Sequence, residues 1–210
     1  MTRGGVTVET EAIENLAPRA HRPDFVSSLL EAGERKLRYK NSMRLLDYWA
    51  NEGGQQQFDP IDVPALLPNL YLLEAIGARF HYRVSGEAVN SLFGSQHRGK
   101  FLDEVVPEAI YPTVAPFFQS VARNESAFFF QGRVAISNRD FLFFERLILP
   151  VQRGGNTMVV GCLSLSNTDK KRPESEPEAR GYDFTVVDRT TGTVREIAHD
   201  IPRASIISAS

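Results

Sequence analysis

The sequence RVSGEAVNSLFG, residues 83–94, contains the change of local structure that decides the fold. Residues 78–84 alternate like a β-strand, and Gly86 then interrupts the alternation. Residues 87–93 fit a helix of about two turns, and Gly94 ends it. Long helices hold a core together, whereas very short helices in series usually curve around an enclosed space. The stretch therefore predicts a strand that leads into a wall of short helices.

The length of the chain, 210 residues, fits one ordinary domain with extensions. A hydrophobic fraction of 42% is enough for a real core, and a net charge of −2 favours neither a nucleic-acid surface nor an acidic tail. No apolar run approaches the ~20 residues that span a bilayer, and the start lacks a signal-peptide core. We therefore expect a cytoplasmic protein that has no membrane or nucleic-acid partner.

The N-terminal part is predicted to be a flexible segment at residues 1–23 followed by an amphipathic helix at 24–54. Apolar side chains recur there at near-helical spacing, in one helix or in two joined near Gly33. The apolar stripe consists of Phe25, Leu29, Leu37, Leu45 and Trp49. An isolated amphipathic helix is marginal in water, so tertiary or subunit packing has to hold it.

Residues 55–168 are expected to form the main domain. Five strands are expected in it, at residues 70–76, 78–84, 127–136, 141–151 and 157–166. A longer helix is expected at 108–123. Residues 169–181 are charged and contain two prolines, which predicts a linker. Residues 182–210 are then a tail in which a small β-hairpin is expected.

This order of elements, together with several motifs, resembles a PAS domain. The motifs are FHYRVSGEAVNSLFGSQHRGKFLDEVVPE from residue 80, FERLILPV from residue 144 and VVGCLSLS from residue 159. The upstream motifs DYW and LLPNLYLL, with FERLILP, are similar to a subfamily of single-domain PAS-like proteins found mainly in alphaproteobacteria. The resemblance covers residues 43–168. It implies an α+β fold in which a five-stranded antiparallel sheet has short helices on one face. The N-terminal amphipathic helix and the C-terminal β-hairpin tail are expected from their own residues, and the tail lies outside the resemblance.

The resemblance also implies a hollow between the short helices and the sheet, where a ligand sits when there is one. Strand alternation predicts which residues line it, and a shift of one residue would exchange the two faces of the sheet. The predicted lining is Phe80, Tyr82, Leu92, Phe101, Phe117, Val121, Phe143 and Leu147, with Arg133 and Arg146. For any single phenylalanine, packing in a filled core is favoured over contact with a ligand.

Three charged residues, Arg133, Glu145 and Arg146, fall inside strands. Glu145 and Arg146 sit amid apolar neighbours, so at least one of these two is expected to be half-buried and paired. A buried arginine could hold a carboxylate or phosphate ligand. The favoured alternative is an internal ion pair, for example between Arg133 and Glu145.

The sequence favours neither a cofactor nor catalysis. PAS domains that bind haem use a histidine, usually on the long helix, and the flavin-binding ones need a cysteine among the short helices. The matching segments have neither residue, so no cofactor is expected. Cys162, the only cysteine, is predicted to be a buried small apolar residue, and His97 a solvated loop residue. None of the four histidines forms a recognisable catalytic motif with a nucleophile or carboxylate, and we expect no catalytic residues, no metal ligands and no enzyme.

The function predicted from the sequence is regulatory. The domain would bind a small molecule or a signalling protein partner and take part in bacterial signal transduction. One alternative is a purely structural adaptor with a filled core, and another is a small α+β enzyme of the cone-shaped fold. A homodimer is also expected, because the outer face of the sheet carries Phe129 or Phe144 and has to be buried against the N-terminal helix or a second subunit. In similar PAS proteins, N-terminal helices pack on that face and against their twin.

Overall fold

A computed structural model gives the structure of the protein, and it describes residues 24–51, 55, 57–92, 94–108, 110–136, 139–165 and 182–199. The helical elements are α1 (Phe25–Lys36), α2 (Lys40–Asn51), η1 (Pro60–Asp62), η2 (Pro64–Asn69), α3 (Glu87–Leu92), α4 (Leu102–Val105) and α5 (Tyr111–Ala122). The strands are β1 (Leu70–Ile76), β2 (Arg79–Ser85), β3 (Ser126–Ile136), β4 (Arg139–Arg153), β5 (Asn156–Leu165), β6 (Tyr182–Asp188) and β7 (Val194–His199). The segments predicted at 1–23 and 169–181 lie outside the described residues.

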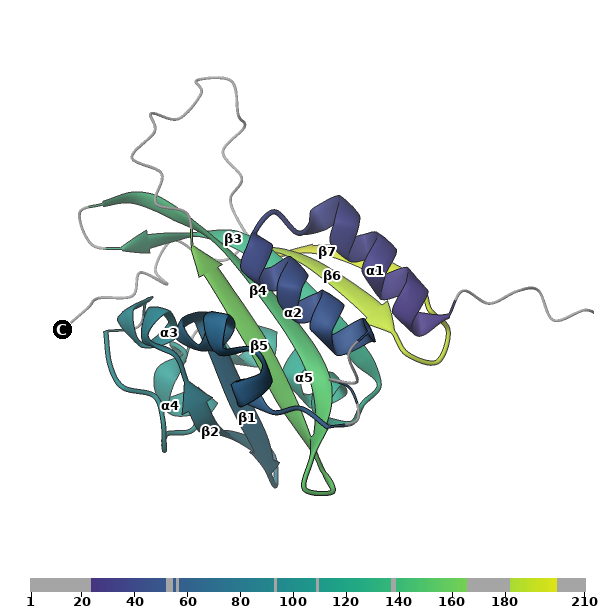
Figure 1. The fold of residues 1–210 in the computed structure, drawn as a ribbon. Coiled ribbons are helices and arrows are strands. Elements are labelled where there is room, and N and C mark those ends of the chain that lie inside the picture. The colour runs from purple at the N-terminus through teal and green to yellow at the C-terminus, as the bar shows by residue number, and fades with distance from the viewer. Residues whose placement is uncertain are drawn as a thin grey trace, which may run out of the picture.

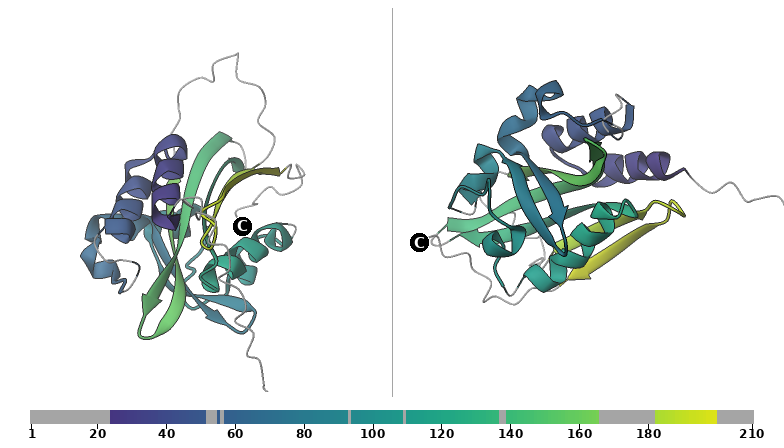
Figure 2. Two further views of the ribbon diagram at one scale, coloured as in Figure 1. Left: turned by 90° about the vertical axis from the view of Figure 1, so that its right-hand side faces the viewer. Right: turned by 90° about the horizontal axis from the view of Figure 1, so that it is seen from below.

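The described strands form one antiparallel sheet of seven strands in the order β2-β1-β5-β4-β3-β6-β7 (Figure 1). Helices α1 and α2 cover one face of it, and α3, α4 and α5 lie against the other (Figure 2). The α+β class and the short helices on one face are therefore as the sequence predicts. The strands expected in the main domain agree with the structure to about two residues at each end.

The number of strands is a correction, because the expected sheet had five and the hairpin of the tail adds two more. β6 pairs with the free edge of β3, so that Ser126 lies opposite Asp188. Phe184 of β6 stacks on Phe130 of β3, with ring centroids 5.0 Å apart. The hairpin joins the sheet because it satisfies the hydrogen-bonding groups of this edge and buries its own apolar side chains there.

The N-terminal helical segment is two helices, and the chain breaks between them at residues 37–39. Leu37 takes an extended conformation, while its N–H still donates to the carbonyl oxygen of Gly33 at 2.8 Å. The whole predicted stripe is buried against the outer face of the sheet. We call this layer the outer cluster; its members include Leu29, Leu45, Trp49, Phe129, Leu147 and Val160. The chain thus covers the outer face with its own helices, and the need for a cover no longer argues for a second subunit.

The region that follows β2 matches the prediction closely. Helix α3 covers residues 87–92, and the backbone turns away at Gly94, whose φ of 70° suits glycine. The chain then runs beside the outer edge of β2, where the Tyr82 N–H donates to the carbonyl oxygen of Lys100 at 2.9 Å. Helix α3, this loop, α4 and the longer α5 together form the wall opposite the sheet.

Candidate functional site

The interior between the sheet and helices α3–α5 is filled by a second group of buried apolar residues, here called the inner cluster. Its aromatic members are Tyr71, Phe80, Tyr82, Phe118, Phe128, Phe130, Phe144 and Phe184. Of the predicted lining, Phe80, Tyr82 and Val121 belong to the inner cluster, and Phe117 packs against it partly buried. The side chains of Leu92 and Arg133 lie outside the described residues.

Two members of the predicted lining, Phe143 and Leu147, lie on the other face of the sheet, so this part of the prediction is wrong. Leu147 belongs to the outer cluster, and the Phe143 ring stacks on Tyr39 between α1 and α2 at 6.4 Å. Phe144 and Ile148 face the inner cluster in their place. The expected alternation of β4 is therefore displaced by one residue.

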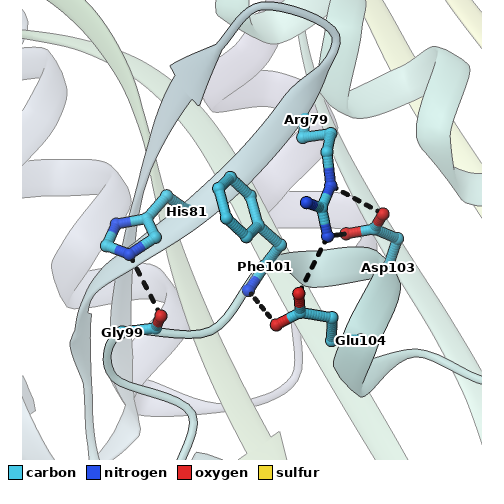
Figure 3. Close-up of polar contacts among 6 residues, drawn as sticks. All are labelled: Arg79, His81, Gly99, Phe101, Asp103 and Glu104. Carbon is cyan, nitrogen blue, oxygen red and sulfur yellow. Dashed lines mark hydrogen bonds and ion pairs between the residues drawn. The ribbon is translucent and has the colours of Figure 1, made fainter.

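Phe101 does not belong to the inner cluster, and this is a further correction. It lies beside the edge strand β2, where Figure 3 draws its contacts. The Arg79 guanidinium stacks on its ring at 3.8 Å and donates to the carboxylates of Asp103 and Glu104 at 2.8–3.0 Å. The Phe101 ring also packs against His81, with centroids 5.1 Å apart. These contacts fasten α4 to the edge strand β2, and as an exposed network they contribute modestly to stability.

Arg146 of β4 faces the inner cluster and is only 6% exposed. Its guanidinium carbon lies 5.8, 5.7 and 6.0 Å from the ring centroids of Tyr71, Phe130 and Phe144. Burying a charge is costly, and the faces of aromatic rings recover part of that cost. Strand β4 thus places a cation among aromatic rings on the face of the sheet that packs against α3–α5.

Tyr71 contributes a phenol to the same place. Its hydroxyl is buried next to the Arg146 guanidinium. The ring lies across Gly161 of the neighbouring strand β5, where a Cβ atom would overlap it. Burial raises the pKa of Tyr71, and the nearby Arg146 opposes this only in part, so the hydroxyl stays a hydrogen-bond donor.

His97 also belongs to this interior, although the sequence predicts a solvated loop residue. It is 0% exposed and packs against the Tyr82 ring at 5.4 Å between centroids. The loop that contains it is held against β2, which turns the side chain inward. Burial lowers the pKa of His97 to about 4, with smaller contributions from the Lys100 and Arg146 charges. The imidazole is therefore neutral near pH 7.

A histidine with a lowered pKa makes the folded state sensitive to acid. The unfolded chain takes up the proton near pH 6.5, whereas the folded protein resists it until about pH 4, so stability falls as the pH drops through this window. We expect about 2 kcal/mol of unfolding free energy to be lost at His97 between pH 7.5 and pH 5. Urea unfolding at both pH values measures it. His97→Gln should remove this part of the loss and His81→Gln should keep it; equal losses in all three proteins would refute the assignment.

Glu145, the neighbour of Arg146, faces the outer cluster and is 0% exposed. Its Oε2 accepts from the Arg38 backbone N–H and from Gln131 Nε2, each at 2.8 Å. The register of the sheet sets Gln131 opposite Glu145 and Arg133 opposite Phe143. The ion pair predicted between Arg133 and Glu145 is not tested, because the Arg133 side chain lies outside the described residues.

A groove of about 340 Å³ lies on the outer face beside the junction of α1 and α2. Its lining residues are Arg38, Tyr39, Lys40, Asn41, Asn69, Ser164 and Leu165. Ser164 of β5 hydrogen-bonds to Ser42 of α2 on the outer face, whereas Leu165 packs against the inner cluster, so the groove lies at the end of β5. It leaves the link between the two helices accessible from one side.

Other chemistry is sparse in the described part of the chain. No three side chains of His, Cys, Asp or Glu gather there into a metal site. Cys162 is buried, as predicted, and burial raises the pKa of its thiol to about 12. None of the helices among the described residues has the length and apolar character to span a bilayer.

An antiparallel sheet whose one face is closed by short helices over a largely aromatic interior defines a class of sensory α+β domain. A family model described as a PAS domain matches residues 37–164 of the 210-residue chain, and the chain belongs to this family. Comparison with curated proteins finds no match. The match confirms the resemblance at the level of the family and indicates a sensor or regulatory domain of signalling. The finer assignment to the subfamily with the DYW and FERLILP motifs stays a prediction.

Proposed function

We propose that this protein is a PAS sensor that binds a small molecule carrying a carboxylate or phosphate group, held beside Arg146 in the inner cluster. The observation that carries the proposal is the Arg146 guanidinium, buried among three aromatic rings on the side of the sheet that faces α3–α5. PAS domains are typically sensory and non-enzymatic, which agrees with a regulatory rather than a catalytic role.

The chemistry around Arg146 supports an anionic ligand. An arginine presents several N–H donors in a planar fork that matches a carboxylate or a phosphate. The Tyr71 hydroxyl, buried next to Arg146, is a second donor. His97 is neutral near pH 7, because burial lowers its pKa to about 4, so it adds no second cation. The aromatic rings around the guanidinium favour a ligand that also has an apolar or planar part.

A second candidate is an interaction module that has a filled core and no ligand. The packing of the aromatic rings favours it. Phe117, Phe128 and Phe184 lie within stacking distance of one another, with centroids 4.6 Å apart for Phe117 and Phe184 and 5.4 Å for Phe117 and Phe128. In that case the domain would act only through its surface, and Arg146 would be a structural cation.

Native mass spectrometry of the purified full-length protein separates the two candidates. We expect a small acidic molecule to be retained by the wild type and to be lost from Arg146→Met, which keeps the bulk of the side chain but removes its charge and N–H donors. The loss in affinity should be about a hundredfold, because a buried ionic hydrogen bond is worth about 1.5–3 kcal/mol.

The matched control for this experiment is Arg98→Met, because Arg98 is an exposed arginine in the same fold. This variant should retain the molecule as the wild type does. Recovery of bare protein in every preparation would reject the ligand and leave the filled-core candidate. A molecule retained equally by Arg146→Met would place the binding site elsewhere.

The remaining parts of the proposal concern partners and location. PAS domains commonly mediate protein interactions and dimerise, and this supports a homodimer and a signalling protein partner. The outer face of the sheet is already covered by α1 and α2, so a dimer would form through the exposed surface of these helices. A bacterial origin and a cytoplasmic location complete the proposal.

A further inference from the structure

The groove beside the link between α1 and α2 is lined by polar and charged side chains that the proposed function does not use. Arg38 and Lys40 are its two cations, and no acidic residue lines it. Its volume of about 340 Å³ lies in the range of sites that hold small molecules. Arg146 is not part of the lining, so the groove and the surroundings of Arg146 are two different places.

The two cations of the groove are not explained by the stability of the fold. Both are exposed, and neither forms an ion pair with any described residue. Lys40 is the first residue of α2, whose first turn contains no acidic residue. The N-terminus of a helix carries a partial positive charge and is stabilised by anions, so a lysine there is unfavourable. By contrast, Lys36 at the C-terminal end of α1 is favourably placed and pairs with Glu196 at 2.8 Å.

The backbone and side chains around the groove are held in place by hydrogen bonds to the sheet. The Arg38 backbone N–H donates to Oε2 of Glu145 at 2.8 Å, which fixes the link. Asn69 donates to the carbonyl oxygen of Leu163 at 2.8 Å and accepts from Nδ2 of Asn41 at 3.0 Å. A site whose walls are already fixed loses less conformational entropy when a ligand binds.

The groove also adjoins unused hydrogen-bonding groups of both kinds. The first backbone hydrogen bond of α2 runs from the Met43 N–H to the carbonyl oxygen of Tyr39 at 3.1 Å, so the N–H groups that precede Met43 remain available to an anion. Glu145 lies beside two lining residues, since it accepts from the Arg38 N–H and lies opposite Ser164 in the sheet. Its other oxygen, Oε1, is buried and has no partner among the described residues.

We infer that this groove is a second binding site, which takes a small molecule that carries a phosphate group. Arg38, Lys40 and the first turn of α2 hold the phosphate, whose charge of about −1.5 to −2 near pH 7 matches two cations. An O–H of the same molecule, on a sugar or on the phosphate itself, is the donor that Oε1 of Glu145 lacks. The inference goes beyond the proposed function and does not depend on it.

An NMR titration of the full-length protein with ribose 5-phosphate, and separately with inorganic phosphate, tests the site. We expect saturable shifts of the backbone amide signals of residues 40–42, with a Kd of about 1 mM or lower. Ribose without a phosphate should cause no such shifts. Tighter binding of the ester would identify an organic phosphate as the ligand, and equal binding would show that the phosphate group alone is recognised.

A pair of double variants separates the groove from a general effect of positive charge. Arg38→Gln with Lys40→Gln should weaken the binding of ribose 5-phosphate about tenfold. Arg35→Gln with Arg44→Gln is the matched control, because it removes two exposed cations of the same two helices that do not line the groove. The net charge changes equally in both proteins, and the control should bind as the wild type does.

Lys40→Glu should change binding and stability in opposite directions. An acidic residue in the first turn of α2 interacts favourably with the helix dipole, so the Tm should rise by about 1–3 °C. The same substitution places a negative charge against the phosphate and should abolish detectable binding. This variant keeps the test valid if the double variant folds poorly, because its loss of binding cannot then be attributed to a loss of structure.

Three results would overturn the inference. They are the absence of saturable shifts at residues 40–42, an equal loss of binding in the two double variants, and wild-type binding by Lys40→Glu. Arg146→Met should leave these shifts unchanged, and their disappearance in this variant would assign the phosphate to the inner cluster instead. A molecule lost from Arg146→Met in native mass spectrometry bears only on the proposed function, so the two proposals succeed or fail separately.

Discussion

Trp49→Ala is expected to lower the free energy of unfolding by about 4 kcal/mol, in the range found when a large buried aromatic side chain is truncated. Trp49 is 0% exposed in the outer cluster, and the Phe25 ring packs edge-on against it at 5.9 Å. Its Nε1 donates to the carbonyl oxygen of Pro150 in β4 at 2.7 Å. The substitution would remove both the apolar contact and the hydrogen bond that join α2 to the sheet. Urea unfolding followed by far-UV circular dichroism measures the loss.

Two further variants divide this effect into its parts. Trp49→Phe keeps an aromatic ring but leaves the Pro150 carbonyl oxygen without its donor, so it should cost about 1–3 kcal/mol. Met43→Ala changes a side chain of the same helix that is 45% exposed, and should change stability by about 0.5 kcal/mol or less. If Trp49→Ala were as mild as Met43→Ala, α2 would not be the cover of the outer face.

Local sequence signals predicted most of the elements but not how many strands share the sheet. Turn residues such as Gly86 and Gly94 and the short alternating runs located β1, β2 and α3 closely. The hairpin at 182–199 was also expected, but its place beside β3 was not. Pairing between distant segments depends on which edge is open and which apolar side chains remain uncovered. Neither property can be read from a short window of sequence.

The candidate site could be predicted only in part, because β4 is covered on both faces. Alternation identifies the buried face of a strand when the other face is polar. In β4 the pairs Phe143–Phe144 and Leu147–Ile148 are apolar on both sides, so the two registers fit the sequence equally well. The structure removes the ambiguity by setting Arg146 among the inner rings and Glu145 beneath the link between the helices.

The burial of His97 could not be predicted for a different reason. A histidine between Gly94 and Gly99 looks like a loop residue, and a loop is normally solvated. The loop is instead fixed along β2 by backbone hydrogen bonds, and the imidazole fills a place beside Tyr82. A backbone contact of this kind leaves no pattern in side-chain polarity. The burial of His97 could have been predicted from the short segment between α3 and α4, because a short connection holds the loop close to β2.

Gly86 marks the passage from β2 to α3, and its replacement by alanine is the second large effect that we expect. A Cβ atom at this position would overlap the backbone carbonyl groups of Leu67 and Pro68 in η2. The Gly86 N–H also donates to the carbonyl oxygen of Leu70 at 2.7 Å, which holds the two segments together. A side chain could rotate away from the new methyl group, whereas these atoms belong to the backbone. They lie in η2, which contains Pro64 and Pro68 and leads directly into β1.

Gly86→Ala should therefore cost about 3 kcal/mol, at the upper end of the range for added groups in a tightly packed site. Gly77→Ala is the matched control, because a Cβ atom there meets nothing within 4 Å and only the backbone conformation, with φ of 61°, opposes it. That control should cost about 1 kcal/mol. Thermal and urea unfolding of both variants measure the difference. A Gly86→Ala protein as stable as Gly77→Ala would mean that η2 can move away from α3. The short helices would then not be fixed as a wall.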